Sequence, residues 1–287
     1  MPTLTPTRIA ALLQPYLGTE VIDNNTLIGQ LNLYLDLLLR WNARTNLTAI
    51  REPEAIVARH FGESLFAARI LSPRLPANAT LLDFGSGAGF PGLPIQLYRP
   101  DLQVTLSESQ NKKATFLREA VRTLGLTTEI WAARTETLPA DRQFNCVTLR
   151  AVDKMDTAIA AATTRVSPTG LMAILAGETS HDQHPAPLAL WSQETHPLPE
   201  STNRHLHLYR HPTPKSKLFH VEQLALRPHP PNLAPKLKCS TWNILAWAIH
   251  WVHPRLALEI SAQSTTSLQV PPIAPRGTIA RPNPSAA

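Results

Sequence analysis

Residues 80–100 read TLLDFGSGAGFPGLPIQLYRP. The stretch opens on an apolar run of strand length, residues 80–84, which meets a turn rich in glycine. Pro91 follows the turn, and the fixed φ angle of proline suits the first turn of a helix. The stretch therefore predicts a strand, a tight turn and a helix, the unit from which parallel α/β sheets are built.

The same alternation continues along the chain. Apolar runs predict strands at residues 80–85, 103–109, 128–133, 144–151 and 170–177, and helical patterns begin at residues 91, 111 and 155. This order predicts an α/β fold with a mostly parallel sheet covered on both faces. A late strand at residues 205–211 is expected as an antiparallel edge.

The segments on either side of this core differ from it. Leu27, Leu31, Leu35 and Leu38 lie at helical spacing, and residues 1–72 are predicted to form an N-terminal helical segment. Residues 78–211 are predicted to be the core. Twelve of the 27 prolines lie in the last 77 residues, so residues 212–287 are expected to be a basic, largely disordered tail with a short Trp-rich helix.

Charge and composition exclude several classes of protein. The net charge of +6 arises from residues 211–287, so the charge of the core says nothing about its partner. The first 20 residues have no secretory pattern, and no apolar run is long enough to span a bilayer. The two cysteines lack metal-ligand spacing. A cytoplasmic protein without a metal or a stable membrane association is expected.

The glycine turn fits two registers. Gly87, Gly89 and Gly92 match the dinucleotide pattern G-x-G-x-x-G. Asp83, Gly85, Gly87 and Gly89 match D-x-G-x-G-x-G, the turn of many methyltransferases. A pyrophosphate would be repelled by a carboxylate beside the turn, whereas the ammonium group of S-adenosylmethionine would tolerate it. Asp83 therefore favours S-adenosylmethionine as the cofactor.

Two later segments extend the predicted site. Glu108 ends the next strand, where a carboxylate can accept both ribose hydroxyls of either cofactor. Thr135 and Glu136 follow the third strand, and their loop is expected either to cover an adenine or to be solvated.

The fourth strand narrows the choice of methyl acceptor. It lacks the N/D-P-P-Y/F turn typical of amine methylation, and Cys146 lies inside an apolar run, which predicts a buried structural cysteine. The N7 atom of guanine needs no general base, only a group that holds the base. Arg150 and Lys154 lie at the carboxyl end of this strand, where substrates of open sheets bind. Arg150 can bond guanine O6, a carboxylate or a phosphate.

Four segments in order resemble one known family. They read RWNARTNLTAIREPEAIVARHFGESL, LLDFGSGAGFPGLPIQLYRPDLQVTLSESQNKKATFLREA, ARTETLP and TLRAV. They are similar to the bacterial ribosomal RNA small subunit methyltransferase G family, also called glucose-inhibited division protein B. The resemblance covers about residues 27–210. It implies a Rossmann-like fold that uses S-adenosylmethionine to methylate N7 of a guanine in 16S ribosomal RNA.

The resemblance also implies roles for single residues. His60 and Ser64 stand in the family's R-H-x-x-D-S segment, in which this chain has Glu63 at the aspartate position. His60 and Arg150 are implied at the catalytic centre. The turn pattern places Asp83, Gly87 and Gly89 at the cofactor, and the resemblance implies that Gly85, Phe90, Glu108, Thr135, Glu136 and Arg150 also bind it.

Two rival functions remain at this point. One is an NAD(P)-dependent oxidoreductase, and the other is a non-catalytic RNA-binding scaffold that keeps the fold. The expected partner is 16S ribosomal RNA or the small ribosomal subunit particle, and the expected state is a monomer.

Overall fold

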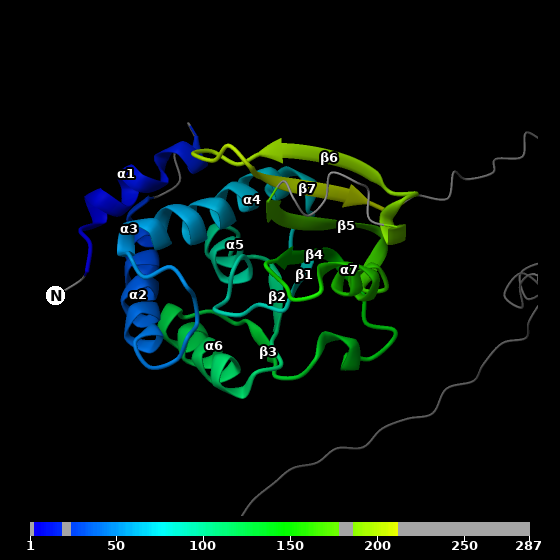
Figure 1. Ribbon diagram of the computed structural model, residues 1–287, viewed down its shortest axis with the longest axis horizontal. Helices are drawn as coiled ribbons and strands as arrows, with labels where there is room; N and C mark the ends of the chain where they lie inside the picture. Colours follow the sequence, from blue (N-terminus) through cyan, green and yellow to red (C-terminus); the bar gives the residue numbers. More distant parts are fainter. Residues whose placement is uncertain (1–2, 19–23, 178–185, 212–287) are drawn as a thin grey trace, which may run out of the picture. The chain divides into compact units, whose positions relative to one another are not determined.

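Figure 1 shows the computed structural model of the chain. The structure describes residues 3–18, 24–177 and 186–211. The predictions for residues 212–287, including the disordered tail and the Trp-rich helix, lie outside the described residues.

The centre of the fold is a seven-stranded sheet with the order β3-β2-β1-β4-β5-β7-β6. Every pairing is parallel except those of β7, which runs antiparallel to β5 and β6. This order, with one reversed strand near an edge, is a Rossmann-like arrangement and agrees with the predicted fold class. The strands are β1 (Thr80–Phe84), β2 (Gln103–Ser107), β3 (Glu129–Trp131), β4 (Phe144–Arg150), β5 (Val166–Gly177), β6 (Ser192–Pro197) and β7 (Arg204–Arg210).

Helices precede the sheet and connect its strands. Pro53 begins a continuous helical stretch to residue 71, and its middle is a π-helical segment, Val57–Gly62. The α-helices are α1 (Pro6–Leu17), α2 (Asn24–Asn42), α3 (Pro53–Ile56), α4 (Glu63–Leu71), α5 (Gly92–Tyr98), α6 (Asn111–Leu124) and α7 (Met155–Thr163). Short 3₁₀ turns lie at Ser72–Arg74, Thr135–Thr137 and Ala186–Leu188.

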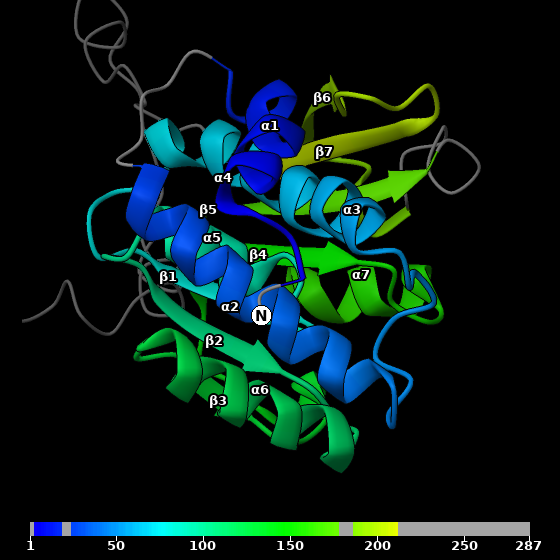
Figure 2. The same cartoon turned by 90° about the vertical axis from the view of Figure 1, so that its left-hand side faces the viewer.

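Both faces of the sheet are buried, which explains the apolar runs in its central strands. Along β1, Leu81 belongs to one hydrophobic cluster and Leu82 to the other. The first cluster includes apolar side chains of α1, α2 and α4, which lie together over the sheet in Figure 2. The second includes Ala158 and Ile159 of α7. The helices before residue 72 thus share a core with the sheet.

One expectation about the sheet edge was wrong, and one strand was missed. The strand at residues 204–210 is antiparallel as predicted, but it is not an edge, because β6 pairs along its outer side. No strand was predicted at β6. Its sequence, SQETHP, is polar and its side chains are mostly exposed, so it lacks the apolar alternation on which a prediction of a strand depends.

Candidate functional site

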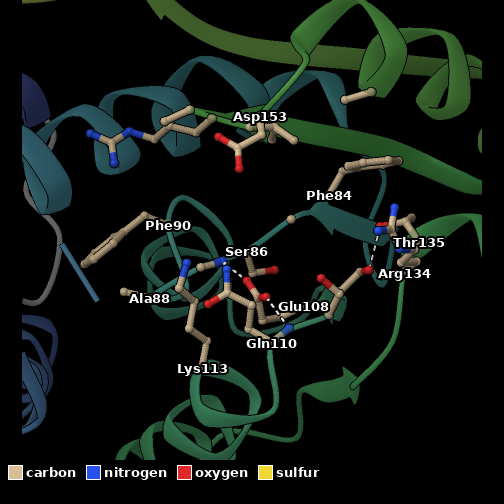
Figure 3. A pocket seen from close by; sticks show the side chains of 18 of the residues that line it. Phe84, Ser86, Ala88, Phe90, Glu108, Gln110, Lys113, Arg134, Thr135 and Asp153 are labelled. Atoms are coloured by element: carbon tan, nitrogen blue, oxygen red, sulfur yellow. Dashed lines mark hydrogen bonds between the residues drawn. The ribbon is translucent and has the colours of Figure 1, made fainter. Parts of the chain in front are cut away.

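The main cavity lies at the carboxyl ends of β1, β2 and β4, above the glycine turn (Figure 3), and has a volume of about 640 Å³. Ligands of open α/β sheets bind at this edge. Two residues predicted for the site, Asp83 and Gly89, do not line the cavity. The predicted residues that line it are His60, Gly85, Gly87, Phe90, Glu108, Thr135, Glu136 and Arg150.

The glycine turn needs its glycines for two different reasons. Gly85, Gly87 and Gly89 have φ angles of 71°, 57° and 88°, a region that side chains disfavour. A Cβ atom on Gly87 would meet no protein atom within 4 Å, so the space beside it opens on the cavity. A Cβ atom on Gly89 would instead lie 2.6 Å from Tyr34 Oη. Gly87 leaves room for a ligand, whereas Gly89 leaves room for helix α2.

Several N–H groups of this turn donate to oxygens of the protein. Ser86 donates to the Ser107 carbonyl at 2.9 Å, and Gly87 donates to Glu108 Oε2 at 3.0 Å. The Gly89, Phe90 and Gly92 N–H groups also donate to protein oxygens. A dinucleotide turn binds its pyrophosphate with free N–H groups. The geometry therefore disfavours a dinucleotide.

Asp83 stabilises the turn from below. Its carboxylate accepts hydrogen bonds from Gly92 N at 3.1 Å and from Thr148 Oγ1 at 2.8 Å, and the side chain is buried. Burial raises the pKa of Asp83 to about 6, although these hydrogen bonds oppose the shift. Asp83 was predicted among the cofactor-binding residues; its carboxylate lies beneath the turn and is not part of the cavity lining.

Glu108 and Thr135 lie on the loops that follow β2 and β3. Glu108 Oε1 accepts from Gln110 N at 2.7 Å, so both carboxylate oxygens are held by backbone groups. Each oxygen keeps a further lone pair for a ligand hydroxyl. Thr135 Oγ1 is 2.6 Å from Ser107 Oγ, which ties the two loops together. The site residues on both loops are therefore fixed in place.

Arg150 is held by the π-helical segment across the cavity. Its guanidinium donates to His60 Nδ1 at 2.8 Å and to the Arg59 carbonyl at 2.9 Å. It also forms an ion pair with Glu63 at 3.1 Å, and the Glu63 side chain is only 2% exposed. Glu63 bonds Arg204 of β7 at 2.7 Å as well. The glutamate at the family's aspartate position thus bridges two arginines from different strands.

His60 is a neutral side chain in this arrangement. Burial, then the positive charges of Arg150 and Arg59, lower its pKa to about 3. The ring stacks on Phe90 with centroids 4.8 Å apart, and its Nε2 atom lies 2.7 Å from Thr48 Oγ1. His60 therefore joins the N-terminal helices to the glycine turn.

The cavity residues that the sequence did not reveal include the polar side chains of Thr48, Lys113 and Arg134. The last two are ordinary cations on loops or helix starts, and nothing in their local pattern marks a site. Thr48 lies in a loop pinned by Asn42, whose Oδ1 accepts from the Leu47 and Thr48 N–H groups. Asn42, the first asparagine in the segment RWNARTNLT, was the signal in the sequence that could have indicated this loop.

Lys154 and Cys146, both weighed from the sequence, have different environments. Lys154 lines the cavity at the start of α7, with a φ angle of 52°. Cys146 is fully buried in the core of the sheet, and burial raises the pKa of its thiol. A buried neutral thiol is a poor nucleophile, so the prediction of a structural cysteine is confirmed.

Two features are absent from the part of the chain that the structure describes. No helix there is both long enough and apolar enough to cross a membrane. No group of three or more His, Cys, Asp or Glu side chains there could hold a metal ion.

Comparisons with known proteins agree in one family. The family described as rRNA small subunit methyltransferase G matches residues 27–205. A ribosomal RNA small subunit methyltransferase G from Xanthomonas euvesicatoria is 38% identical over 192 residues, which is 66% of this chain and 88% of the relative. One from Stenotrophomonas maltophilia is 38% identical, covering 62% of this chain and 82% of the relative.

Solved structures give weaker matches. A 16S rRNA N2 methyltransferase from T. thermophilus, in complex with AdoMet and guanosine, has a TM-score of 0.43 and 18% identity, covering 52% of this chain and 43% of that one. A putative methyltransferase from Escherichia coli has a TM-score of 0.43 and 16% identity, covering 52% and 85%. By the extent of its sequence match, this chain belongs to the rRNA small subunit methyltransferase G family.

Proposed function

We propose that this protein is an S-adenosylmethionine-dependent methyltransferase that methylates N7 of a guanine in 16S ribosomal RNA. The observation that carries the proposal is the glycine turn. Its Gly87 and Gly89 N–H groups donate to protein oxygens, while Gly87 leaves open space beside Glu108 on the cavity wall. This arrangement suits a ligand that needs room and ribose contacts at the turn but brings no pyrophosphate.

The cofactor would lie along the carboxyl edge of the sheet. Glu108, after β2, is suited to accept the ribose hydroxyls, and Thr135 and Glu136, after β3, would border the adenine. The methionine moiety would occupy the space beside Gly85, Gly87 and Phe90, after β1. The strand order β3-β2-β1 presents these three groups in that sequence along one edge. Asp83 and Gly89 act on the cofactor indirectly, by shaping the turn.

Methyl transfer to guanine N7 needs no general acid or general base. S-adenosylmethionine supplies a methyl group on an activated sulfonium, and guanine N7 has a lone pair in the base plane and no proton to lose. The protein must hold the reacting atoms in line, and such positioning can supply several kcal/mol of the rate enhancement. The low pKa of His60 fits this view, since a neutral, hydrogen-bonded imidazole positions neighbours rather than taking a proton.

The substrate would enter beside β4, on the far side of β1 from the adenine site. Arg150, at the end of β4, braces this wall through His60 and Glu63. Lys154 and Lys113 line the same cavity and carry positive charge suited to RNA phosphates. We propose a cytoplasmic monomer acting on 16S ribosomal RNA or on the small subunit particle.

A binding experiment separates this function from its rivals. Calorimetry should detect S-adenosylhomocysteine binding and no NADH binding. Tight NADH binding without S-adenosylhomocysteine binding would favour an oxidoreductase, and binding of neither ligand would favour a scaffold. Methylated guanines should then be mapped in 16S ribosomal RNA from cells with and without the protein. An unchanged map would refute the assignment of the reaction.

A further inference from the structure

Thr48 lies on the cavity wall and is held from several sides. Its backbone N–H donates to Asn42 Oδ1 at 3.0 Å, and its carbonyl accepts from Asn42 Nδ2 at 3.0 Å. Its hydroxyl oxygen is 2.7 Å from His60 Nε2 and 3.1 Å from Ile50 N, which donates to it. Thr48 therefore lines the cavity, and its hydroxyl is held in a fixed position beside His60.

The direction of the Thr48–His60 hydrogen bond follows from Arg150. A guanidinium can only donate, so His60 Nδ1 must be the acceptor of the 2.8 Å bond. A neutral imidazole has one N–H group, which must then be at Nε2. The low pKa of His60 keeps the ring neutral at physiological pH. His60 Nε2–H therefore donates to Thr48 Oγ1.

Glu63 fixes the position of the Arg150 guanidinium and so supports the assigned direction of the Thr48–His60 hydrogen bond. It binds the Arg150 guanidinium from the buried side and is itself anchored by Arg204 at 2.7 Å. Arg150 is thus held with its Nη1 atom directed at His60. A chain of fixed donors runs from Arg150 through His60 to Thr48.

The hydrogen of the Thr48 hydroxyl has no acceptor among the described residues. Its oxygen accepts two hydrogen bonds, from His60 and from Ile50, which uses both of its lone pairs. Among the residues that the structure describes, none accepts a hydrogen bond from this hydroxyl. Its hydrogen is free to be donated, and the group lines the cavity. Thr48 is therefore a donor-only group that faces the ligand.

The strand order indicates which ligand this donor meets. The adenine, ribose and methionine positions proposed above follow β3, β2 and β1, and β4 comes next along the edge. Thr48 is connected through His60 to Arg150, at the end of β4. It therefore belongs to the side of the cavity left for the methyl acceptor.

We propose that Thr48 donates its hydroxyl hydrogen to O6 of the substrate guanine and so selects guanine over adenine. This inference rests on the proposed function. Guanine carries the O6 acceptor next to N7, whereas adenine carries an N6 amino donor at that place. To accept from an adenine, Thr48 would have to give up its bond from His60 or from Ile50. Adenine would thus be rejected by an unpaired donor.

Thr48→Val and Thr48→Ser test this bond with little change in shape. Thr48→Val removes the hydroxyl, and single-turnover methylation of small subunits from cells lacking the enzyme should fall about 10- to 100-fold. Thr48→Ser keeps the hydroxyl and should stay close to wild type. The affinity for S-adenosylhomocysteine should be unchanged in both variants. Equal rates for wild type and Thr48→Val would overturn the proposal.

Substitution of the substrate tests the same contact through a ratio of rates within each protein, which does not change if a smaller fraction of Thr48→Val is folded. Subunits carrying 2-aminopurine, which lacks O6, at the mapped guanine should react slowly with wild type and with Thr48→Ser. The ratio of guanine to 2-aminopurine rates should collapse only in Thr48→Val, because the two changes remove one bond. An equal ratio in all three proteins contradicts the inference.

Two other outcomes have distinct meanings. If Thr48→Val weakens S-adenosylhomocysteine binding in proportion to its loss of rate, the hydroxyl serves the cofactor and the proposal is wrong. If wild type binds no S-adenosylhomocysteine at all, the proposed function itself fails.

Discussion

Arg150 Nη1 lies 2.8 Å from His60 Nδ1, and the two residues are 90 positions apart in the sequence. This contact joins the end of β4 to the π-helical segment before α4. It also sets the tautomer of His60, because only the unprotonated nitrogen can face a guanidinium. Arg150, which was expected from the sequence to hold a ligand, thus forms its hydrogen bonds mainly with other residues of the protein.

Arg150→Ala is expected to reduce both rate and stability. Single-turnover methylation should fall on the order of 10²-fold, since His60 and Thr48 lose their fixed orientation. The variant also leaves Glu63 with one partner, and breaking a buried ion pair costs about 3 kcal/mol. Single-turnover methylation assays would measure the loss of rate, and urea unfolding of the same samples would measure the loss of stability.

Arg150→Lys is the matched control for this change. It keeps the positive charge for Glu63 but cannot reproduce the planar set of donors toward His60 and the Arg59 carbonyl. It should recover stability more than rate. Full rate in Arg150→Ala would show that the contact with His60 has no part in the reaction.

Gly87→Val should abolish S-adenosylhomocysteine binding while leaving the protein folded. The valine side chain would project into the open space beside the turn, at a φ angle of 57°. That backbone region costs about 1–2 kcal/mol for a residue with a side chain. Gly125→Val is a matched control: Gly125 has a φ angle of 66° and open space, but it ends α6 and does not line the cavity. Calorimetry should detect binding in Gly125→Val alone.

The stability of the protein should depend on pH through Asp83. Its pKa is about 6 in the fold, against 3.8 for the free side chain. Between these values the native state keeps a proton that the unfolded state has lost. The contribution of Asp83 to the free energy of unfolding is therefore largest below pH 4. It falls by at most about 1.4 kcal/mol per pH unit as the pH rises to 6.

Asp83→Asn isolates this contribution, because the amide does not titrate. Both proteins should be unfolded with urea from pH 4 to pH 8. The free energy of unfolding of wild type relative to that of Asp83→Asn should fall up to pH 6 and stay constant above it. A difference independent of pH would mean that the pKa of Asp83 is not raised.

Much of the fold could be predicted because its signals are local. The apolar runs of the central strands are buried on both faces. The carboxyl ends of parallel strands meet at one edge, which brings Glu108, after β2, and Thr135, after β3, to the turn that follows β1. The contacts that could not be predicted are long-range. Glu63 meets Arg204 across 141 positions, and no sequence pattern encodes that pair. The π-helical turn that brings His60 to Arg150 reads as ordinary helix.

The segment after residue 211 gives the last prediction. Removing residues 215–287 should leave a folded enzyme that binds S-adenosylhomocysteine, because every described helix and strand ends by Arg210. This segment carries the basic excess of the chain. The full protein should therefore bind RNA more tightly at low salt, with the advantage falling by roughly 0.7 to 0.9 log units per tenfold rise in salt for each phosphate contacted. Filter binding at a series of salt concentrations should show the two proteins converging near physiological ionic strength. An affinity gap that persists at high salt would instead assign a specific RNA contact to the segment, and loss of folding on truncation would place part of it in the core.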